Sequence, residues 1–121
     1  MAAVRYLVND VDQALMFYTL QLGFTLEKRY GDAMAIVKNG DATLWLAGPS
    51  SSAARPLPNG SKPEPGGWNR MVLSVAGLDP VLKKLDANGI ALRGPVVIGP
   101  GGRQVLVEDP SGNLIELFEP A

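Results

Sequence analysis

The sequence of 121 residues contains no cysteine and no histidine, and these two absences exclude several kinds of chemistry. Zinc sites of the usual kind need thiolate or imidazole ligands. Thiol nucleophiles need cysteine, and Ser–His relays need imidazole. Disulfide bonds are impossible, so cysteine usage says nothing about the redox compartment. Any metal ion would depend on carboxylates, carbonyl groups and water, and proton transfer would fall mainly to Asp, Glu, Lys or Tyr.

An excess of one charge and long apolar runs are also missing. Lys plus Arg number 11 and Asp plus Glu number 12, so the chain lacks the basic excess typical of nucleic-acid-binding proteins. No apolar run approaches the roughly 20 residues that cross a bilayer, and no signal-peptide pattern opens the sequence. We therefore predict a cytoplasmic protein with no nucleic-acid and no membrane partner. Its length and its 46% of hydrophobic residues fit one domain with a small core.

Proline, serine and glycine concentrate in one stretch, residues 49–67, which carries five of the ten prolines. Such a composition cannot sustain a helix or a central strand, and the stretch is long for an ordinary connection. It is either a linker or a functional loop. The linker is favoured, because similar patterns stand on both sides of it.

The first half, about residues 3–48, predicts one strand, one helix and three strands. A β-rich run at 4–8 precedes Asp10, which begins a helix with Gln13 three residues later in a capping-box pattern. Val11, Leu15, Tyr18 and Leu22 form its apolar stripe, and Gly23 ends it. Turn residues at 31–32 and 39–40 separate the three strands, which are 24–30, 33–38 and 42–47.

The second half, about residues 68–120, predicts the same order. A strand at 70–75 precedes a helix with Asp79 at its N-cap and Pro80 at its first position, which ends at 88–89. The remaining strands are 90–93 with 96–98, then 103–108 and 114–118, and residues 99–102 form a hairpin loop. The fold class is therefore α+β, with two βαβββ modules. One helix covers only one face of a four-stranded sheet, so two modules, in one chain or two, would form a curved mixed sheet with a cleft that suits a ligand.

Two segments resemble the vicinal oxygen chelate superfamily. They are Val-Asn-Asp-Val-Asp-Gln-Ala-Leu-Met-Phe-Tyr at 8–18 with Leu-Gly-Phe at 22–24, and Glu-Asp-Pro-Ser-Gly-Asn-Leu-Ile-Glu-Leu-Phe-Glu at 108–119. That superfamily includes glyoxalase I, ring-cleaving dioxygenases, fosfomycin resistance enzymes and bleomycin-binding resistance proteins. The resemblance covers nearly the whole chain except the loop. It implies the glyoxalase/bleomycin resistance fold, a small-molecule ligand and a homodimer.

The resemblance also locates the four metal-ligand positions of the superfamily's metal enzymes. They fall on Ala3, Trp45, Arg70 and Glu116. Of these four residues, only Glu116 has a side chain that can bind a metal ion, because alanine and tryptophan offer no suitable lone pair and arginine only donates hydrogen bonds. We therefore predict no metal site and no cofactor.

The residues that replace the ligands predict another kind of site. A guanidinium at Arg70 would neutralise Glu116 where the metal would lie, and Arg5 shares a strand face with Ala3. Trp45 would supply a flat apolar wall, and Trp68 with Asn69 would form the edge of a lid. The predicted ligand-binding residues are Arg5, Trp45, Trp68, Asn69, Arg70 and Glu116. The alternatives are a core position for Trp45 and a purely structural Arg70–Glu116 pair.

Three functions follow from this site. The first is a metal-free binding protein that sequesters an antibiotic or a metabolite in clefts of a homodimer. The second is a metal-independent lyase or isomerase in which Glu116 is the catalytic base and Arg70 or Arg5 stabilises an enolate or oxyanion. The third is a metabolite-sensing module without catalysis. Metal-dependent glyoxalase I (lactoylglutathione lyase) and ring-cleaving dioxygenase activities are disfavoured by the missing ligands.

Overall fold

The computed structural model describes residues 2–121, which form two compact units. The first unit contains the chain up to Gly67 together with Asp109–Asn113, and the second contains Trp68–Glu108 and Leu114–Ala121. The proline-rich stretch belongs to the first unit and contains one short 3-10 turn, Ser52–Ala54. Within the described residues, no helix is long and apolar enough to cross a membrane.

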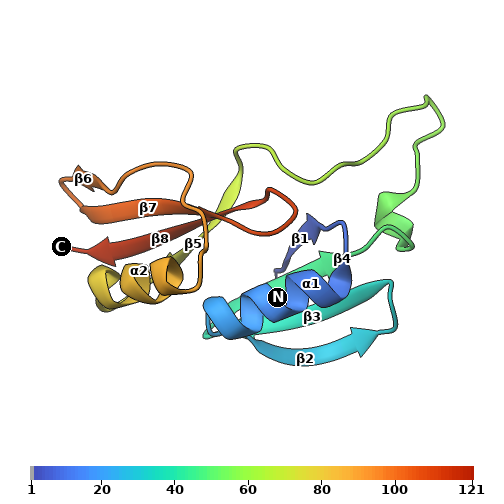
Figure 1. Cartoon of the computed structure of the whole chain (residues 1–121). Helices are drawn as coiled ribbons and strands as arrows, with labels where there is room; N and C mark the ends of the chain where they lie inside the picture. The colour runs from blue at the N-terminus through green and yellow to red at the C-terminus, as the bar shows by residue number, and fades with distance from the viewer. Residues whose placement is uncertain (1) are drawn as a thin grey trace. The chain divides into compact units, whose positions relative to one another are not determined.

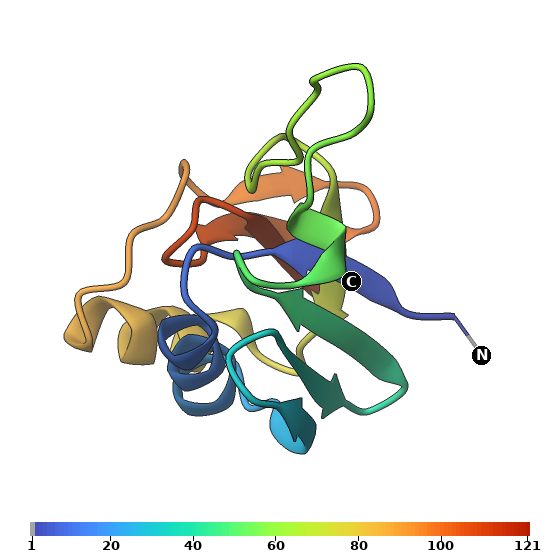
Figure 2. The same cartoon turned by 90° about the vertical axis from the view of Figure 1, so that its right-hand side faces the viewer.

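The first unit contains a four-stranded mixed sheet and one helix. The strands are β1 (Val4–Leu7), β2 (Thr25–Tyr30), β3 (Met34–Asn39) and β4 (Ala42–Ala47), and the helix is α1 (Val11–Met16) continued by the π-helical turn η1 (Phe17–Gln21). The strand order is β1-β4-β3-β2, with β1 parallel to β4 and the other pairs antiparallel. The blue helix lies against one side of the teal and green strands (Figures 1 and 2).

The predicted helix signals are confirmed at both ends. The backbone N–H of Gln13 donates to Asp10 Oδ1 at 2.9 Å, which makes Asp10 the N-cap. Gly23 follows the helix with a φ of 73°, the left-handed conformation that ends many helices. The predicted apolar stripe is partly wrong: Leu15 is only half-buried, whereas Ala14 and Phe17 are buried. The other three predicted residues, Val11, Tyr18 and Leu22, are buried.

The core of the first unit lies between the helix and one face of the sheet. Tyr18 of the helix is fully buried, as are Leu44 and Leu46 of β4 and Val37 of β3. Because successive strand residues point to opposite faces, Trp45 lies on the other face of β4, away from the helix.

A buried turn at Asp109–Asn113 completes the first unit. The Asp109 side chain is 4% exposed and accepts four hydrogen bonds, from the hydroxyl of Tyr18 (2.7 Å), the N–H of Ser111 (2.8 Å), and the N–H (2.9 Å) and Nδ2 (3.1 Å) of Asn113. Asn113 Nδ2 also donates to the Leu7 carbonyl at 2.7 Å, and its Oδ1 accepts from the Gly66 N–H at 2.8 Å. One buried carboxylate therefore organises the turn, and the turn binds the end of β1 and the end of the loop.

The second unit repeats the same architecture. Its strands are β5 (Arg70–Ser74), β6 (Val97–Gly99), β7 (Gly102–Glu108) and β8 (Leu114–Pro120), and its helix is α2 (Leu78–Ala87). The order β5-β8-β7-β6 matches that of the first sheet, with β5 parallel to β8. The predicted α+β class and the repeated β-α-β-β-β order are confirmed. The strand expected at 90–93 is wrong, because only Leu92 forms an isolated bridge there, to Val107.

Helix α2 begins differently from the prediction. Its N-cap is Gly77, and Asp79 lies in the first turn instead of capping it. Glu119 of β8 takes over the capping function, since its Oε1 accepts from the Leu78 N–H at 2.8 Å. Asp79 pairs with Arg103 at 3.3 Å, and Arg103 also binds Glu119 at 2.9 Å. These hydrogen bonds hold the pKa of Glu119 below its usual value, with the Arg103 contact as the largest cause.

The hairpin between β6 and β7 depends on Gly102. Its φ is 146°, and a Cβ at this position would lie 2.1 Å from the carbonyl oxygen of Glu119. Any side chain would therefore force β7 and the end of β8 apart.

The Tyr18–Asp109 hydrogen bond generates a stability prediction. Tyr18→Phe removes a buried hydrogen bond to a charged group, so we expect the free energy of unfolding to fall by about 1.5–3 kcal/mol. Burial raises the pKa of the Tyr18 hydroxyl far above its usual value, and the Asp109 charge raises it further. The unfolded chain then loses this proton more easily than the folded one. The contribution is complete below about pH 10 and declines as the pH rises above it.

Urea unfolding at several pH values measures both effects. The wild-type protein should lose more stability between neutral and strongly alkaline pH than the Tyr18→Phe variant does. Tyr30→Phe is the matched control, because Tyr30 is 46% exposed and its variant should stay within about 0.5 kcal/mol of wild type. Equal losses from the two substitutions would contradict the prediction.

Candidate functional site

The first unit brings Arg5 and Trp45 together on the sheet face opposite the helix. The two residues are register partners on the parallel strands β1 and β4. The Arg5 guanidinium carbon lies 5.0 Å from the centroid of the Trp45 ring, within the range of a cation–π interaction. Ile36 of β3 is the register partner of Trp45 on the other side. The predicted aromatic wall is thus flanked by a cation and an aliphatic side chain.

Trp45 carries a buried polar atom that nothing in the described chain satisfies. Its Nε1 is the one buried side-chain nitrogen or oxygen within residues 2–121 that has no hydrogen-bond partner. An unmade hydrogen bond of this kind costs about 1–3 kcal/mol in desolvation. The side chain as a whole is half-buried and does not belong to the core on the helix side.

A pocket of about 390 Å³ adjoins Trp45 on the same unit. Two lysines of the lining differ in their contacts. Lys38 Nζ lies 3.3 Å from Glu27 Oε1, whereas Lys28 Nζ lies 4.9 Å from the centroid of the Tyr30 ring. The lining residues come from β2, β3 and β4 and are Glu27, Lys28, Ile36, Lys38, Thr43 and Trp45.

Sequence reasoning missed both lysines of this pocket, although one signal pointed to Lys38. Counting in steps of two from the hairpin at 39–40 places Ile36 and Lys38 on one face of β3. Their position beside Trp45 requires the pairing of β3 with β4, in which Ile36 faces Trp45 and Lys38 faces Thr43.

The second unit brings Arg70 and Glu116 together. Arg70 Nε and Nη2 both donate to Glu116 Oε1, at 3.2 and 3.1 Å. Glu116 is 8% exposed, so this charge is largely withdrawn from water and needs its partner. Glu116 Oε2 accepts no hydrogen bond from the described residues, which leaves one carboxylate oxygen available.

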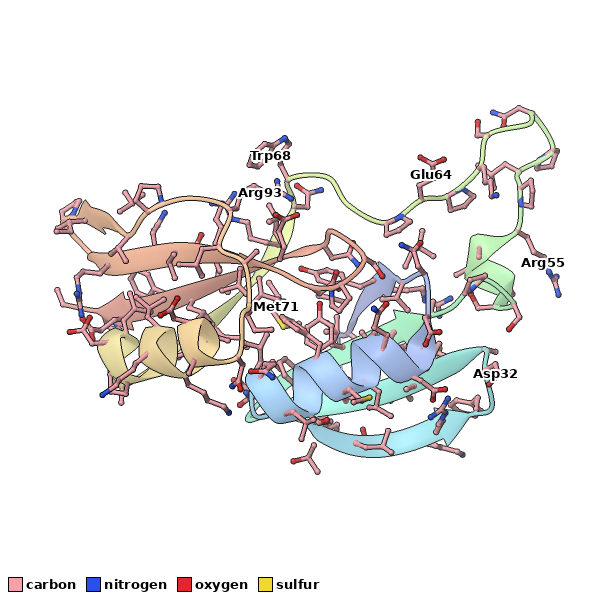
Figure 3. The ribbon with its side chains drawn as sticks, viewed as in Figure 1. Asp32, Arg55, Glu64, Trp68, Met71 and Arg93 are labelled. Atoms are coloured by element: carbon pink, nitrogen blue, oxygen red, sulfur yellow. The ribbon has the colours of Figure 1, made fainter. Side chains whose placement is uncertain are left out.

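Trp68 stands beside this pair and has a cation of its own. The Arg93 guanidinium carbon lies 4.9 Å from the centroid of the Trp68 ring, and the two side chains are adjacent in Figure 3. Arg93 Nη2 donates to Glu108 Oε1 at 2.8 Å, and this hydrogen bond lowers the pKa of the Glu108 carboxyl. Arg70 Nη1 also donates to the Trp68 carbonyl at 3.4 Å. Trp68 is 66% exposed, so its ring is presented to solvent.

The structure therefore groups the predicted site residues into two sets, one in each unit. Arg5 lies with Trp45, and Arg70 lies with Glu116 and Trp68. Asn69 is exposed, and its side chain makes no hydrogen bond to the described residues. Arg93 and Glu108 were missed, because the contacts of Arg93 with Trp68 and with Glu108 depend on how the segment before β6 lies beside β7 and carry no local sequence signal.

Of the residues at the four expected metal positions, only Glu116 carries a side chain that can bind a metal ion. Within residues 2–121 there is no group of three or more Asp, Glu, His or Cys side chains placed to hold an ion. Ala3 is exposed and has no donor atom, Trp45 is a hydrogen-bond donor only, and Arg70 places a positive charge directly on Glu116.

The two βαβββ units, each with the same strand order, define the fold class, and comparison identifies the family. The model of the Glyoxalase/Bleomycin resistance protein/Dioxygenase superfamily matches residues 1–117, and the chain belongs to this superfamily. No curated protein matches the sequence.

Solved structures with the same fold differ in what they do. TnmS3, an antibiotic binding protein from Streptomyces sp. CB03234, is 27% identical with a TM-score of 0.68, over 100% of this chain and 97% of that one. Lactoylglutathione lyase from Agrobacterium tumefaciens is 22% identical with a TM-score of 0.73, over 98% and 92%. The fosfomycin resistance protein FosX from Listeria monocytogenes is 12% identical with a TM-score of 0.75, over 100% and 93%. At such identities the last two establish the fold alone.

The Arg70–Glu116 contact generates a second prediction. Arg70→Met leaves a buried carboxylate without its partner, so we expect a loss of about 1–2 kcal/mol, less than for a fully buried pair because the Arg70 side chain is 31% exposed. Adding Glu116→Gln should recover much of the loss, because the unpaired charge is then removed.

A double-mutant cycle by urea unfolding gives the coupling energy between the two side chains. Arg55→Met, on the proline-rich loop, controls for removal of an arginine. Additive effects of Arg70→Met and Glu116→Gln would show that the contact contributes nothing to stability.

Proposed function

We propose that this protein binds a small organic molecule without a metal ion and thereby sequesters an antibiotic or a metabolite. The Arg70–Glu116 ion pair carries the proposal. The guanidinium of Arg70 pairs with the Glu116 carboxylate, which by resemblance to the superfamily's metal enzymes would bind the metal. Since arginine stays protonated at any usable pH and has no lone pair to offer, this cation supplies charge but no open coordination position.

The two tryptophans support a binding function. The chain contains only two tryptophans, and each has a guanidinium within 5.0 Å of its ring centroid, Arg5 at Trp45 and Arg93 at Trp68. Flat aromatic surfaces bind planar ligands with little loss of conformational entropy. A guanidinium beside the ring orients the polar substituents of such a ligand. The likeness to TnmS3, an antibiotic binding protein, agrees with a small organic ligand.

The protein acts as a homodimer, as the superfamily resemblance implies, and it does so in the cytoplasm. Arg5, Trp45, Trp68, Asn69, Arg70 and Glu116 contact the ligand.

A thermal-shift screen against a panel of antibiotics and small metabolites tests this function. A true ligand at one hundred times its Kd should stabilise the protein by about 2.7 kcal/mol. The shift should survive dialysis against a chelator, and elemental analysis should find no stoichiometric transition metal. Trp45→Ala should abolish the shift, whereas Ile98→Ala, at a side chain 79% exposed on β6, should preserve it. A shift that disappears on chelation and returns with a divalent metal would overturn the metal-free proposal.

One observation favours a second candidate function, a metal-independent lyase or isomerase. Glu116 is mostly buried, yet its Oε2 is not engaged by the described residues, so it is placed to take a proton from a bound carbon acid. Arg70 would then stabilise the developing negative charge.

Glu116→Gln separates the two functions once a ligand is known from the screen. In an enzyme, this variant should keep affinity within a few-fold and lose at least about a hundredfold in turnover, the usual contribution of a general base. In a binding protein, incubation of the ligand with wild type leaves it chemically unchanged by mass spectrometry. Unaltered turnover in the variant would exclude Glu116 as the base.

A further inference from the structure

We infer that the pocket beside Trp45 selects an organic anion, a molecule with an apolar or aromatic body and a carboxylate or similar charged oxygen group. The inference rests on the proposed binding function and names the ligand class for the part of the proposed site around Trp45. It involves only residues of the first unit.

The pocket has the size and the floor for such a body. Its volume of about 390 Å³ lies within the range of roughly 300–1,000 Å³ that is typical of small-molecule sites. Ile36 and Trp45 are register partners on β3 and β4, so their side chains lie side by side on the same face. This pair offers one aliphatic and one aromatic surface for the apolar part of a ligand.

The charges around this floor are unbalanced toward positive. The lining contains Lys28 and Lys38 against Glu27, an excess of one positive charge. Glu27 is paired with Lys38, and within residues 2–121 Lys28 forms no ion pair. Arg5 adds another cation against the Trp45 ring. The chain as a whole carries a net charge of −1, so the positive pocket does not follow from composition.

The unsatisfied indole of Trp45 indicates the same class of ligand. An indole N–H only donates hydrogen bonds, so its partner must be an acceptor. Buried donors in native proteins nearly always have one. The described residues supply none to Trp45 Nε1. An oxygen of a bound anion would satisfy this donor, and the neighbouring cations would favour a charged oxygen over a neutral one.

Benzoate and benzamide test the inference, because they match in size and shape and differ in charge at neutral pH. With isotope-labelled protein, the two tryptophans give two indole signals in a proton–nitrogen NMR spectrum, and Trp45→Phe assigns them. We expect benzoate to shift the Trp45 indole signal downfield and to bind at least about fivefold more tightly than benzamide. The difference should shrink as salt concentration rises.

Two lysine variants locate the charge that makes the selection. Lys28→Gln should weaken benzoate binding about twofold to fivefold and leave benzamide binding unchanged, the range expected for an exposed charge contact. Lys83→Gln makes the same change on the exposed surface of α2 and should leave both affinities as in wild type.

Three results would overturn the inference. Equal affinities for benzoate and benzamide would show that the pocket is merely apolar, while ligand binding itself would stand. A shift of the Trp68 signal without the Trp45 signal would place the anion elsewhere. If neither compound moves either signal at millimolar concentration, the pocket has no affinity for aromatic anions. The proposed binding function would then be judged by the thermal-shift screen alone.

Discussion

The buried carboxylate of Asp109 is the interaction on which most of the candidate site depends. It fixes the turn that holds Asn113, and Asn113 in turn binds the Leu7 carbonyl at the end of β1 and the Gly66 N–H at the end of the loop. The predicted ligand-binding residues lie close to these anchors along the chain. Arg5 precedes Leu7 by two residues, Trp68 and Arg70 follow Gly66 by two and four, and Glu116 follows Asn113 by three. A single buried carboxylate with four donors thus fixes the turn that lies next in the chain to the strands carrying the predicted ligand-binding residues.

A buried carboxylate is stable only if its partners are complete, and the first unit supplies them in an unusual way. Three of the four donors to Asp109 come from the turn itself, so they form as soon as the turn forms. The fourth, the Tyr18 hydroxyl, comes from the π-helical turn that interrupts the regular helix. The tyrosine ring also packs edge-on against Phe17 and Phe24, with centroids at 5.1 and 5.5 Å. The aromatic packing therefore holds the hydroxyl in place, and the polar contact costs little additional side-chain entropy.

Much of the fold could be predicted from the sequence because its signals are local. The Asp10 cap, Gly23 and the turn residues at 39–40 each act over a few residues, and the structure confirms them. The capping of α2 could not be predicted in this way, since Glu119 lies 41 residues from Leu78 and displaces the nearer Asp79. The same limit applies to the site. The superfamily resemblance implied that Arg70 lies near Glu116. Lys28 lies beside Ile36 only through the pairing of β2 with β3, and Arg93 reaches Trp68 only through the fold of the segment before β6, which no spacing in the sequence specifies.

The proposed function follows from what a guanidinium can and cannot do in place of a metal. A bound metal ion exchanges ligands and polarises oxygen atoms through open coordination positions. Arg70 directs two donors at one oxygen of Glu116 and offers no such position. In the proposed function the charge of Glu116 is balanced without a Lewis acid, so affinity comes from surfaces and hydrogen-bond donors. The first unit has these in the Trp45 ring, its unsatisfied N–H and the cations beside it. The proposed binding of organic anions requires a site of this kind, in which Arg70 stands in place of a metal ion on one sheet and the other sheet offers a positively charged, aromatic surface.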